Sequence, residues 1–383
     1  MIIDSDTESV SVSIGYLLKF IREHMRQLSI LLIASAISCL VLADSKNISL
    51  TVATTHPATV PWTALIRDYF IPECERRISL TEYKNSITWT AHYGNLYRWK
   101  DSLNGVQIGL SDVGWVGSVW ESSRLPLQNI TYDLPFITND LVALIEVVNQ
   151  LHVQIPELAS SWRNNNVEFL AATGTDTYHL VTDFPVDTID DLKGKRILAP
   201  GAASIWLKGT GAIAVNGALT SYYTQLKTGA ADGAVTILTG AYPFKLHEVA
   251  PYITLVGVGA QSVGALTVNS DRWKTLPDEI KEILKEVALE YSRLSSQAGM
   301  QLYLTAVQKL KEEGAFFSTL NEREKLRWIE GLPLLSQQWV DRYQAMGLPA
   351  KRILFDLMDG LRSKGVTPTF DWDKAVLNQT GPN

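Results

Sequence analysis

Nucleophiles and metal ligands are present in this sequence of 383 residues, but their spacing suits neither hydrolysis nor metal binding. A serine hydrolase holds its nucleophile in a Gly-x-Ser-x-Gly turn, and Ser204, in GAASIW, lacks those glycines. Cys74 lies in IPECERR, an acidic stretch with helical spacing, which indicates a half-buried helix residue. The six histidines show no HxxxH pair, and the two cysteines form no CxxC pair. We therefore expect no enzyme active site, no metal site and no cofactor.

The charge of the chain excludes one class of partner. The net charge is −6, with acidic and basic residues interspersed and no basic stripe that could follow a phosphate backbone. Nucleic acid is therefore not expected as a partner. The acidic pair Asp190-Asp191 lies in a polar turn, where a carboxylate ordinarily caps backbone N–H groups.

Residues 1–43 are predicted to be a secretory signal rather than part of the fold. The apolar run LSILLIASAISCLVLA follows three basic residues, Lys19, Arg22 and Arg26. The run ends in small residues, with Val41 and Ala43 at the cleavage positions, so that the mature chain would start near Asp44. It is shorter than the roughly 20 apolar residues of a membrane span. The sequence therefore predicts export to the periplasm.

Two details of this segment stay open in the sequence. Residues 1–24 are polar and can be an extended start, in which case Met25 is the initiator. The segment can also remain as an uncleaved anchor, or Cys39 can carry a lipid, although the residues before it form a poor lipidation motif.

Strand-like and helix-like stretches alternate from residue 48 onward. Helices are expected at 61–77 and 98–109, where apolar residues recur with helical spacing. Short strands bounded by turn residues are expected at 48–56, 86–93, 111–117, 167–174, 178–182, 196–200, 230–236 and 252–260. This alternation predicts an α/β fold with substantially parallel sheets.

The last third of the chain is predicted to be mainly helical. Pro277, Asp278 and Glu279 open a helix whose apolar positions keep helical spacing for about 30 residues. A helix of this length exceeds a small domain and should bridge or back two lobes. Two further helices are expected at 321–346 and 349–362, and the tail from Thr367 is expected to be loosely held.

A series of motifs resembles the extracytoplasmic solute-binding proteins of tripartite ATP-independent periplasmic (TRAP) transporters, the DctP-type family. The resemblance covers almost all of the predicted mature chain and is strongest between Asp190 and Pro277. The matching motifs, in order, are DLKGKRILAP (191–200), Gly211-Ala212 with Val215, YYTQLKTGAADG (222–233), Phe244-Lys245 with Glu248-Val249, and Trp273 with Leu276-Pro277. The ordered set is specific, whereas one motif alone would be weak.

The resemblance implies a two-lobed fold like that of type II periplasmic binding proteins, with long bridging and C-terminal helices. The expected lobes are discontinuous: residues 44–174 with 262–300, and residues 175–261 with 301–383. Such a protein closes on a small organic ligand and delivers it to the membrane permease subunits of a TRAP transporter. It is not an enzyme.

The chain departs from the family pattern at three polar anchors. The family places an Arg two residues before the Pro, where its guanidinium pairs with the carboxylate of the ligand, and this chain has Leu198 there. Arg196, two residues earlier, is expected to point to solvent near the turn. Tyr178 replaces a second basic residue, and Thr236 replaces an Asn.

These replacements predict a hydrophobic or aromatic monoacid or a neutral compound as the ligand, rather than a dicarboxylate. Without the guanidinium, a dicarboxylate would lose its hydration without compensation. Trp120 is a further wall candidate, and His179 or Lys208 could hold a single carboxylate. The predicted ligand-binding residues, most of them at strand ends, are His56, Trp62, Trp115, Tyr178, Leu198, Trp206 and Thr236. Each tryptophan can alternatively fill the core.

An alternative function is a periplasmic sensing module that presents its ligand to a signalling partner. Both functions require the same closing cleft, so the sequence does not separate them.

Overall fold

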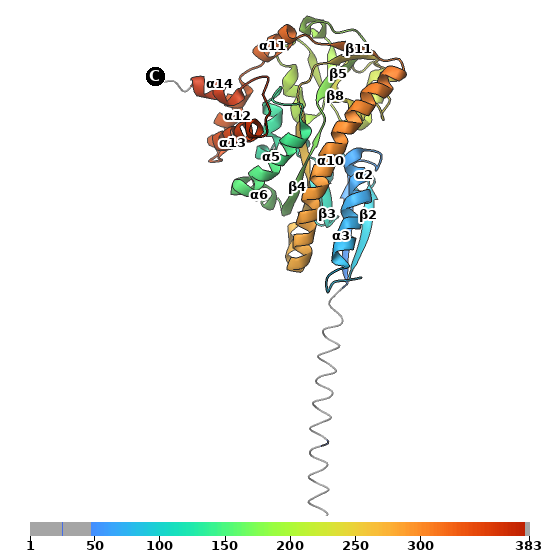
Figure 1. Ribbon diagram of the computed structural model, residues 1–383. Coiled ribbons are helices and arrows are strands. Elements are labelled where there is room, and N and C mark those ends of the chain that lie inside the picture. The colour runs from blue at the N-terminus through green and yellow to red at the C-terminus, as the bar shows by residue number, and fades with distance from the viewer. Residues whose placement is uncertain (1–24, 26–46, 380–383) are drawn as a thin grey trace, which may run out of the picture. The chain divides into compact units, whose positions relative to one another are not determined.

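The computed structural model describes residue 25 and residues 47–379, which form parts of two compact units (Figure 1). Of the smaller unit, the structure describes residues 25, 47–49 and 83–88, and within it the Ile48 N–H donates to the Ser86 carbonyl at 2.6 Å. Of the larger unit, it describes residues 50–82 and 89–379. Apart from Met25, the predicted signal segment lies outside the described residues.

The first sheet has the order β2-β1-β3-β10-β4. Its strands are β1 (Ile48–Thr54), β2 (Ile87–Tyr93), β3 (Val113–Val116), β4 (Val167–Thr175) and β10 (Gln261–Asn269). β1 and β3 are parallel, whereas β10 runs antiparallel to both β3 and β4. Every residue of β10 is buried, so the strand lies in the interior of its sheet.

The second sheet has the order β11-β9-β5-β8-β6-β7. Its strands are β5 (Tyr178–Thr182), β6 (Arg196–Ala199), β7 (Ile213–Asn216), β8 (Gly233–Ile237), β9 (Tyr252–Leu255) and β11 (Phe316–Thr319). β6 is parallel to β7 and β8, whereas β5 is antiparallel to β8 and β9. The α/β class is confirmed, but the expectation of substantially parallel sheets is wrong, because both sheets are mixed.

β5 and β10, which run antiparallel to their neighbours, are each the first strand after the chain crosses from one sheet to the other. β4 of the first sheet is followed after only two residues, Asp176 and Thr177, by β5 of the second sheet. The chain returns from β9 to β10 through residues 256–260, where the Val258 N–H donates to the Tyr178 carbonyl at 3.1 Å. These two neighbouring connections join the sheets in the manner of a two-lobed binding protein.

The helix expected at 61–77 is present but interrupted by a wider turn. It comprises α2 (Pro61–Leu65), a π-helical turn (Ile66–Phe70) and α3 (Ile71–Ile78). Pro72 lies at the start of α3 and has no backbone N–H, so a regular α-helical bond cannot form there.

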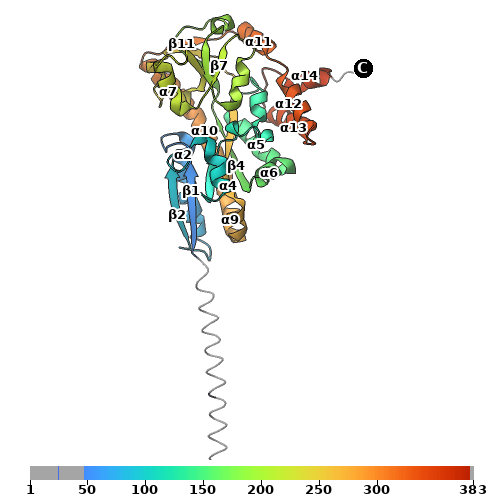
Figure 2. The same cartoon turned by 180° about the vertical axis from the view of Figure 1, so that it is seen from behind.

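The remaining helices of the two lobes are short, with α5 as the exception. They are α4 (Ser102–Gln107), α5 (Leu141–Gln154), α6 (Pro156–Arg163), α7 (Leu219–Lys227), α8 (Leu238–Ala241) and α9 (Ser270–Thr275), with 3-10 segments at Trp99–Asp101, Ser118–Trp120, Pro126–Asp133, Ile189–Leu192, Gly201–Leu207 and Leu246–Glu248. Viewed from behind, α4 lies beside the first sheet and α7 beside the second, in agreement with their contacts to β3 and β8 (Figure 2).

The long helix is confirmed as α10 (Asp278–Glu312), which has 35 residues (Figure 1). It contacts β4 and α5 on the first sheet and α8 on the second. Tyr303 in α10 hydrogen-bonds to Nε2 of His179 in β5 at 3.0 Å. One helix therefore packs against both sheets.

The C-terminal region differs from its prediction in two ways. The helix expected at 321–346 is two helices, α11 (Glu322–Gly331) and α12 (Leu335–Gln344), because Pro333 lies between them. The chain continues through α13 (Ala350–Ser363), which packs against α5, to α14 (Trp372–Gln379).

The expectation of a loosely held tail from Thr367 is wrong. Trp372 is 1% exposed, and its indole N–H donates to the Pro135 carbonyl at 2.7 Å. Arg362 donates to both carboxylate oxygens of Asp373, at 2.7 and 2.8 Å, and to Asp371 at 2.6 Å. A buried tryptophan and a bidentate ion pair therefore fix the tail.

Candidate ligand-binding site

A cavity lies between the two sheets, where strands of both sheets end. The first sheet and its loops contribute His56, Trp62, Trp115, Val119, Trp120, Tyr132, Thr175 and Val263. The second sheet and its connections contribute Tyr178, Pro200, Leu219, Tyr222, Thr236 and Ile237. Crevices beyond strand ends are where α/β proteins bind ligands, so this cavity is the candidate site.

Aromatic rings form the first-sheet wall. His56 lies two residues beyond the end of β1 and meets Trp62 edge-on, with ring centroids 5.4 Å apart, and Trp115 edge-on at 5.8 Å. Trp62 and Trp115 lie nearly parallel at 6.1 Å, and Trp120 lies 6.4 Å from Trp115. Such rings offer large apolar faces to a flat ligand.

His56 is held as a neutral side chain. Its Nδ1 lies 2.7 Å from the Thr55 hydroxyl, and burial lowers its pKa to about 4. At neutral pH it contributes an uncharged imidazole to the wall, because burial disfavours the charged form.

Tyrosines from both sides of the cavity form a further part of its wall. The hydroxyls of Tyr132 and Tyr178 lie 3.4 Å apart, and burial raises the pKa of both, so they stay protonated. Trp206 lies behind them, stacked on Tyr132 at 5.4 Å and edge-on to Tyr178 at 5.1 Å. The Trp206 indole donates to the Tyr132 carbonyl at 2.7 Å, which makes it the support of this wall.

The structure brings five of the seven predicted ligand-binding residues to the cavity: His56, Trp62, Trp115, Tyr178 and Thr236. Trp206 lies in the layer behind them and does not line the cavity. Leu198 is 0% exposed and lies in the core of the second sheet with Tyr222 and Ala234. Leu198 does not line the cavity because it lies within β6. Pro200, two residues later, lies beyond the strand and does line the cavity.

Several lining residues were not among the predicted contacts. Pro200 could have been found from the DLKGKRILAP motif, because it ends the motif beyond the strand. Tyr222 is the first residue of the YYTQLKTGAADG motif, which begins in α7, so that motif could have pointed to it. Tyr132 comes from a 3-10 segment without periodic spacing, so no sequence signal pointed to it.

His179 and Lys208, the expected alternative partners of a carboxylate, do not line the cavity. Nδ1 of His179 accepts from the backbone N–H groups of Val256 and Gly257, at 3.1 and 3.2 Å, so that this side chain fixes the connection between the sheets. No Asp, Glu, Lys or Arg is among the described residues that line the cavity. Arg196 pairs with Asp232, its Nη2 lying 2.5 Å from the carboxylate, at the other end of its strand.

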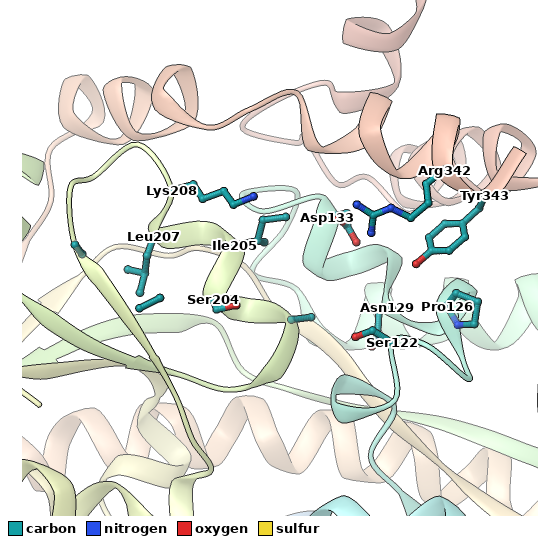
Figure 3. Close-up of a pocket in the computed structure, with 13 residues that line it drawn as sticks. Ser122, Pro126, Asn129, Asp133, Ser204, Ile205, Leu207, Lys208, Arg342 and Tyr343 are labelled. Carbon is teal, nitrogen blue, oxygen red and sulfur yellow. The ribbon is translucent and has the colours of Figure 1, made fainter. Parts of the chain in front are cut away.

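A second pocket, with about 1010 Å³ of empty space, holds the charged groups that the cavity lacks (Figure 3). Lys208 and Arg342 lie on either side of Asp133, and both cations are exposed. Burial raises the pKa of Asp133 to about 7 against the opposing effect of Arg342 and Lys208. Because its cations face solvent, this pocket does not provide the dry enclosure that small-ligand sites use.

Neither Ser204 nor Cys74 has surroundings that would activate it as a nucleophile. The Ser204 hydroxyl donates to the Gly201 carbonyl at 3.1 Å rather than to a base. Cys74 is fully buried, and burial raises the pKa of its thiol, which opposes thiolate formation. No group of three or more His, Cys, Asp or Glu among the described residues could hold a metal ion.

The family model of bacterial extracellular solute-binding proteins, family 7 (DctP), matches residues 89–341. The chain belongs to this family. Among its relatives is the C4-dicarboxylate-binding protein DctB of Bacillus subtilis (strain 168), 24% identical over 254 residues, which are 64% of this chain and 70% of DctB.

Solved structures of TRAP solute-binding proteins share the fold of this family 7 member. One, from a marine metagenome, is specific for aromatic acid ligands and was crystallised with 3-hydroxybenzoate; its TM-score is 0.73 at 19% identity, over 83% of this chain and 99% of that one. Another, from Haemophilus influenzae RdAW, has bound L-gulonate; its TM-score is 0.69 at 18% identity, over 82% and 99% of the two chains. These similarities confirm the two-lobed fold.

Residues 47–379, together with residue 25, include no helix that is both long and apolar enough to cross a membrane.

Proposed function

We propose that this family 7 protein is the periplasmic receptor of a TRAP transporter for a hydrophobic or aromatic ligand. The observation that carries this proposal is the cavity between the sheets, which is walled by Trp62, Trp115, Trp120 and Tyr178 and to which the described chain contributes no ionised side chain. An aromatic enclosure without a cation favours an apolar body with few polar groups.

The relatives support a small organic ligand, and their ligand classes differ. The marine TRAP protein binds aromatic acids, whereas the names of the Bacillus relative and the Haemophilus protein indicate a C4-dicarboxylate and L-gulonate. The absence of a lining Arg or Lys in the described chain favours the aromatic class over the other two, because both of those expose many acceptors that a cation or several donors must satisfy.

The proposed ligand contacts are the five predicted residues at the cavity, together with Trp120. The proposed lobes are residues 44–174 with 262–300 and residues 175–261 with 301–383, joined by the two connections beside Tyr178. We propose that the predicted signal segment, residues 1–43, directs export of the protein to the periplasm. Closure of the lobes would bury the ligand and form the surface that the membrane permease subunits recognise.

A thermal-shift screen tests the ligand class. The protein expressed from its full coding sequence is heated with aromatic acids, neutral ring compounds, dicarboxylates and sugar acids. A ligand at 100 times its dissociation constant stabilises the folded state by about 2.7 kcal/mol, which shifts the melting temperature measurably. Stabilisation by succinate or L-gulonate, with no response to any ring compound, would contradict the proposal.

Delivery to a permease requires a separate test. The receptor is combined with TRAP membrane permease subunits in proteoliposomes, and uptake of the labelled ligand is measured under an ion gradient. Uptake that depends on the receptor supports transport. Tight binding without uptake would favour the alternative function, a periplasmic sensing module for a signalling partner.

A further inference from the structure

Four polar atoms of residues that line the cavity are buried without a hydrogen-bond partner within the described chain. They are the indole Nε1 atoms of Trp62 and Trp120 and the hydroxyls of Thr175 and Tyr222. Trp62 is 7% exposed and Tyr222 is 0% exposed, so their surroundings exclude bulk solvent. A buried donor without a partner destabilises a protein, and native proteins rarely retain one without a reason.

Other polar groups around the cavity are already bonded within the protein. The Trp115 indole donates to the Thr173 hydroxyl at 2.8 Å, and Nδ1 of His56 lies 2.7 Å from the Thr55 hydroxyl. The Tyr132 and Tyr178 hydroxyls pair with each other. The four unpaired atoms are therefore groups at this cavity that remain available to a ligand.

These atoms select the charge of the ligand. Two indole N–H groups donate only, and the Thr175 and Tyr222 hydroxyls can each donate or accept, which suits the neutral oxygen of a carbonyl or hydroxyl group. A carboxylate would lie where the described lining residues supply no cation and where His56 is held neutral.

We propose that the ligand is an uncharged ring compound whose carbonyl or hydroxyl oxygen accepts from Trp62 and Trp120 and pairs with Tyr222. The ring lies against the indole faces of the first-sheet wall. This inference rests on the proposed receptor function and narrows its ligand class from monoacids and neutral compounds to neutral compounds alone.

Matched ligand pairs test the charge directly. The protein expressed from its full coding sequence is titrated by calorimetry at pH 7.5 with benzamide against benzoate, and with 3-hydroxybenzyl alcohol against 3-hydroxybenzoate. The neutral member of each pair is expected to bind at least about tenfold more tightly, because only the acid loses ionic hydration.

The outcomes separate this inference from the receptor function. Tighter binding of the acids overturns the inference and leaves a receptor for aromatic ligands. Failure of every ring compound, with binding of succinate or L-gulonate, overturns both the inference and the proposed ligand class. Failure of all of these compounds also overturns the inference.

Variants test the named atoms. Acetophenone and ethylbenzene share a ring and differ in the carbonyl, so the ratio of their affinities measures the bonds to that oxygen. Trp120→Phe and Tyr222→Phe are each expected to reduce the ratio by about two- to tenfold, the loss that one hydrogen bond of ordinary net strength produces.

Trp339→Phe is the matched control. Trp339, in α12, also has a buried indole N–H without a partner in the described chain, but it does not line the cavity. Its replacement is expected to leave both affinities unchanged. Tyr222→Phe should not lower the melting temperature of the ligand-free protein, since the lost hydroxyl has no partner there. An acetophenone-to-ethylbenzene ratio that is the same in wild type, Trp120→Phe and Tyr222→Phe would overturn the proposal.

Discussion

Replacing Gly201 with alanine should impair ligand binding by preventing the close approach of two loops. Gly201 directly follows Pro200 in the second lobe and has a φ of +40°. A Cβ at this position would lie 2.3 Å from the carbonyl oxygen of Val119, which belongs to the first-lobe wall of the cavity. The two backbones meet there without a side chain between them.

The size of the effect follows from that distance. Because Cβ contacts below 3.0 Å are essentially never observed, the two segments must move apart by at least 0.7 Å, the difference between 3.0 and 2.3 Å. Overpacking of this kind costs about 1–3 kcal/mol. If the contact forms only when the lobes close on the ligand, the whole cost falls on binding and weakens affinity by about 5- to 150-fold.

Gly194→Ala is the control for backbone strain. Gly194 also has a positive φ, +74°, but a Cβ there has nothing within 4 Å. Both variants should lose stability in the ligand-free state, because alanine resists positive φ. Only Gly201→Ala should lose ligand affinity, measured by calorimetry with the ring compound that stabilises the wild type most. X-ray scattering with that ligand bound should show the lobes of Gly201→Ala farther apart than those of Gly194→Ala. Equal affinities for the two variants would refute the closure argument.

Two further substitutions test the structure itself. Arg362→Ala should lower the free energy of unfolding, measured in urea, by roughly 3 kcal/mol, because it leaves the buried carboxylate of Asp373 without its cation. Arg362→Lys should recover only part of this loss. An unchanged urea midpoint in Arg362→Ala would contradict a stabilising role of the ion pair. Burial raises the pKa of Asp176 to about 7, so the folded state holds the carboxyl proton more tightly than the unfolded state does. The contribution of Asp176 to stability is therefore full below about pH 4 and is lost as the pH rises through 7. Asp176→Asn should therefore raise stability at pH 8 by on the order of 2–4 kcal/mol relative to its effect at pH 4, and the same effect at both pH values would contradict this assignment.

Local patterns predicted most of the individual elements. The strands around Val113 and Tyr178 and the helix that opens at Asp278 were recognisable, because apolar spacing and end signals are properties of short segments. β10, QSVGALTVN, was missed, because it is buried on both faces and its residues do not alternate. Strand direction also lay beyond local patterns, since it depends on where the chain passes between the sheets.

The residues that line the candidate cavity were predictable where they lie at the ends of strands. His56 and Tyr178 reached the cavity because each lies at the end of a strand that faces it. Leu198 showed that a family position inside β6 need not meet the ligand cavity once its long side chain is replaced by a short one. The docking of Trp372 onto the Pro135 carbonyl joins segments more than 200 residues apart, so no local pattern could predict it.

The burial of Cys74 has a practical consequence for following the motion of this protein. Its thiol is fully enclosed and its raised pKa keeps it protonated, so dyes and spin labels that attack thiolates will not reach it in the folded state. Cysteines introduced on the surface of each lobe would then be labelled in preference to Cys74, and a pair of labels could report the opening and closing of the lobes without first removing Cys74.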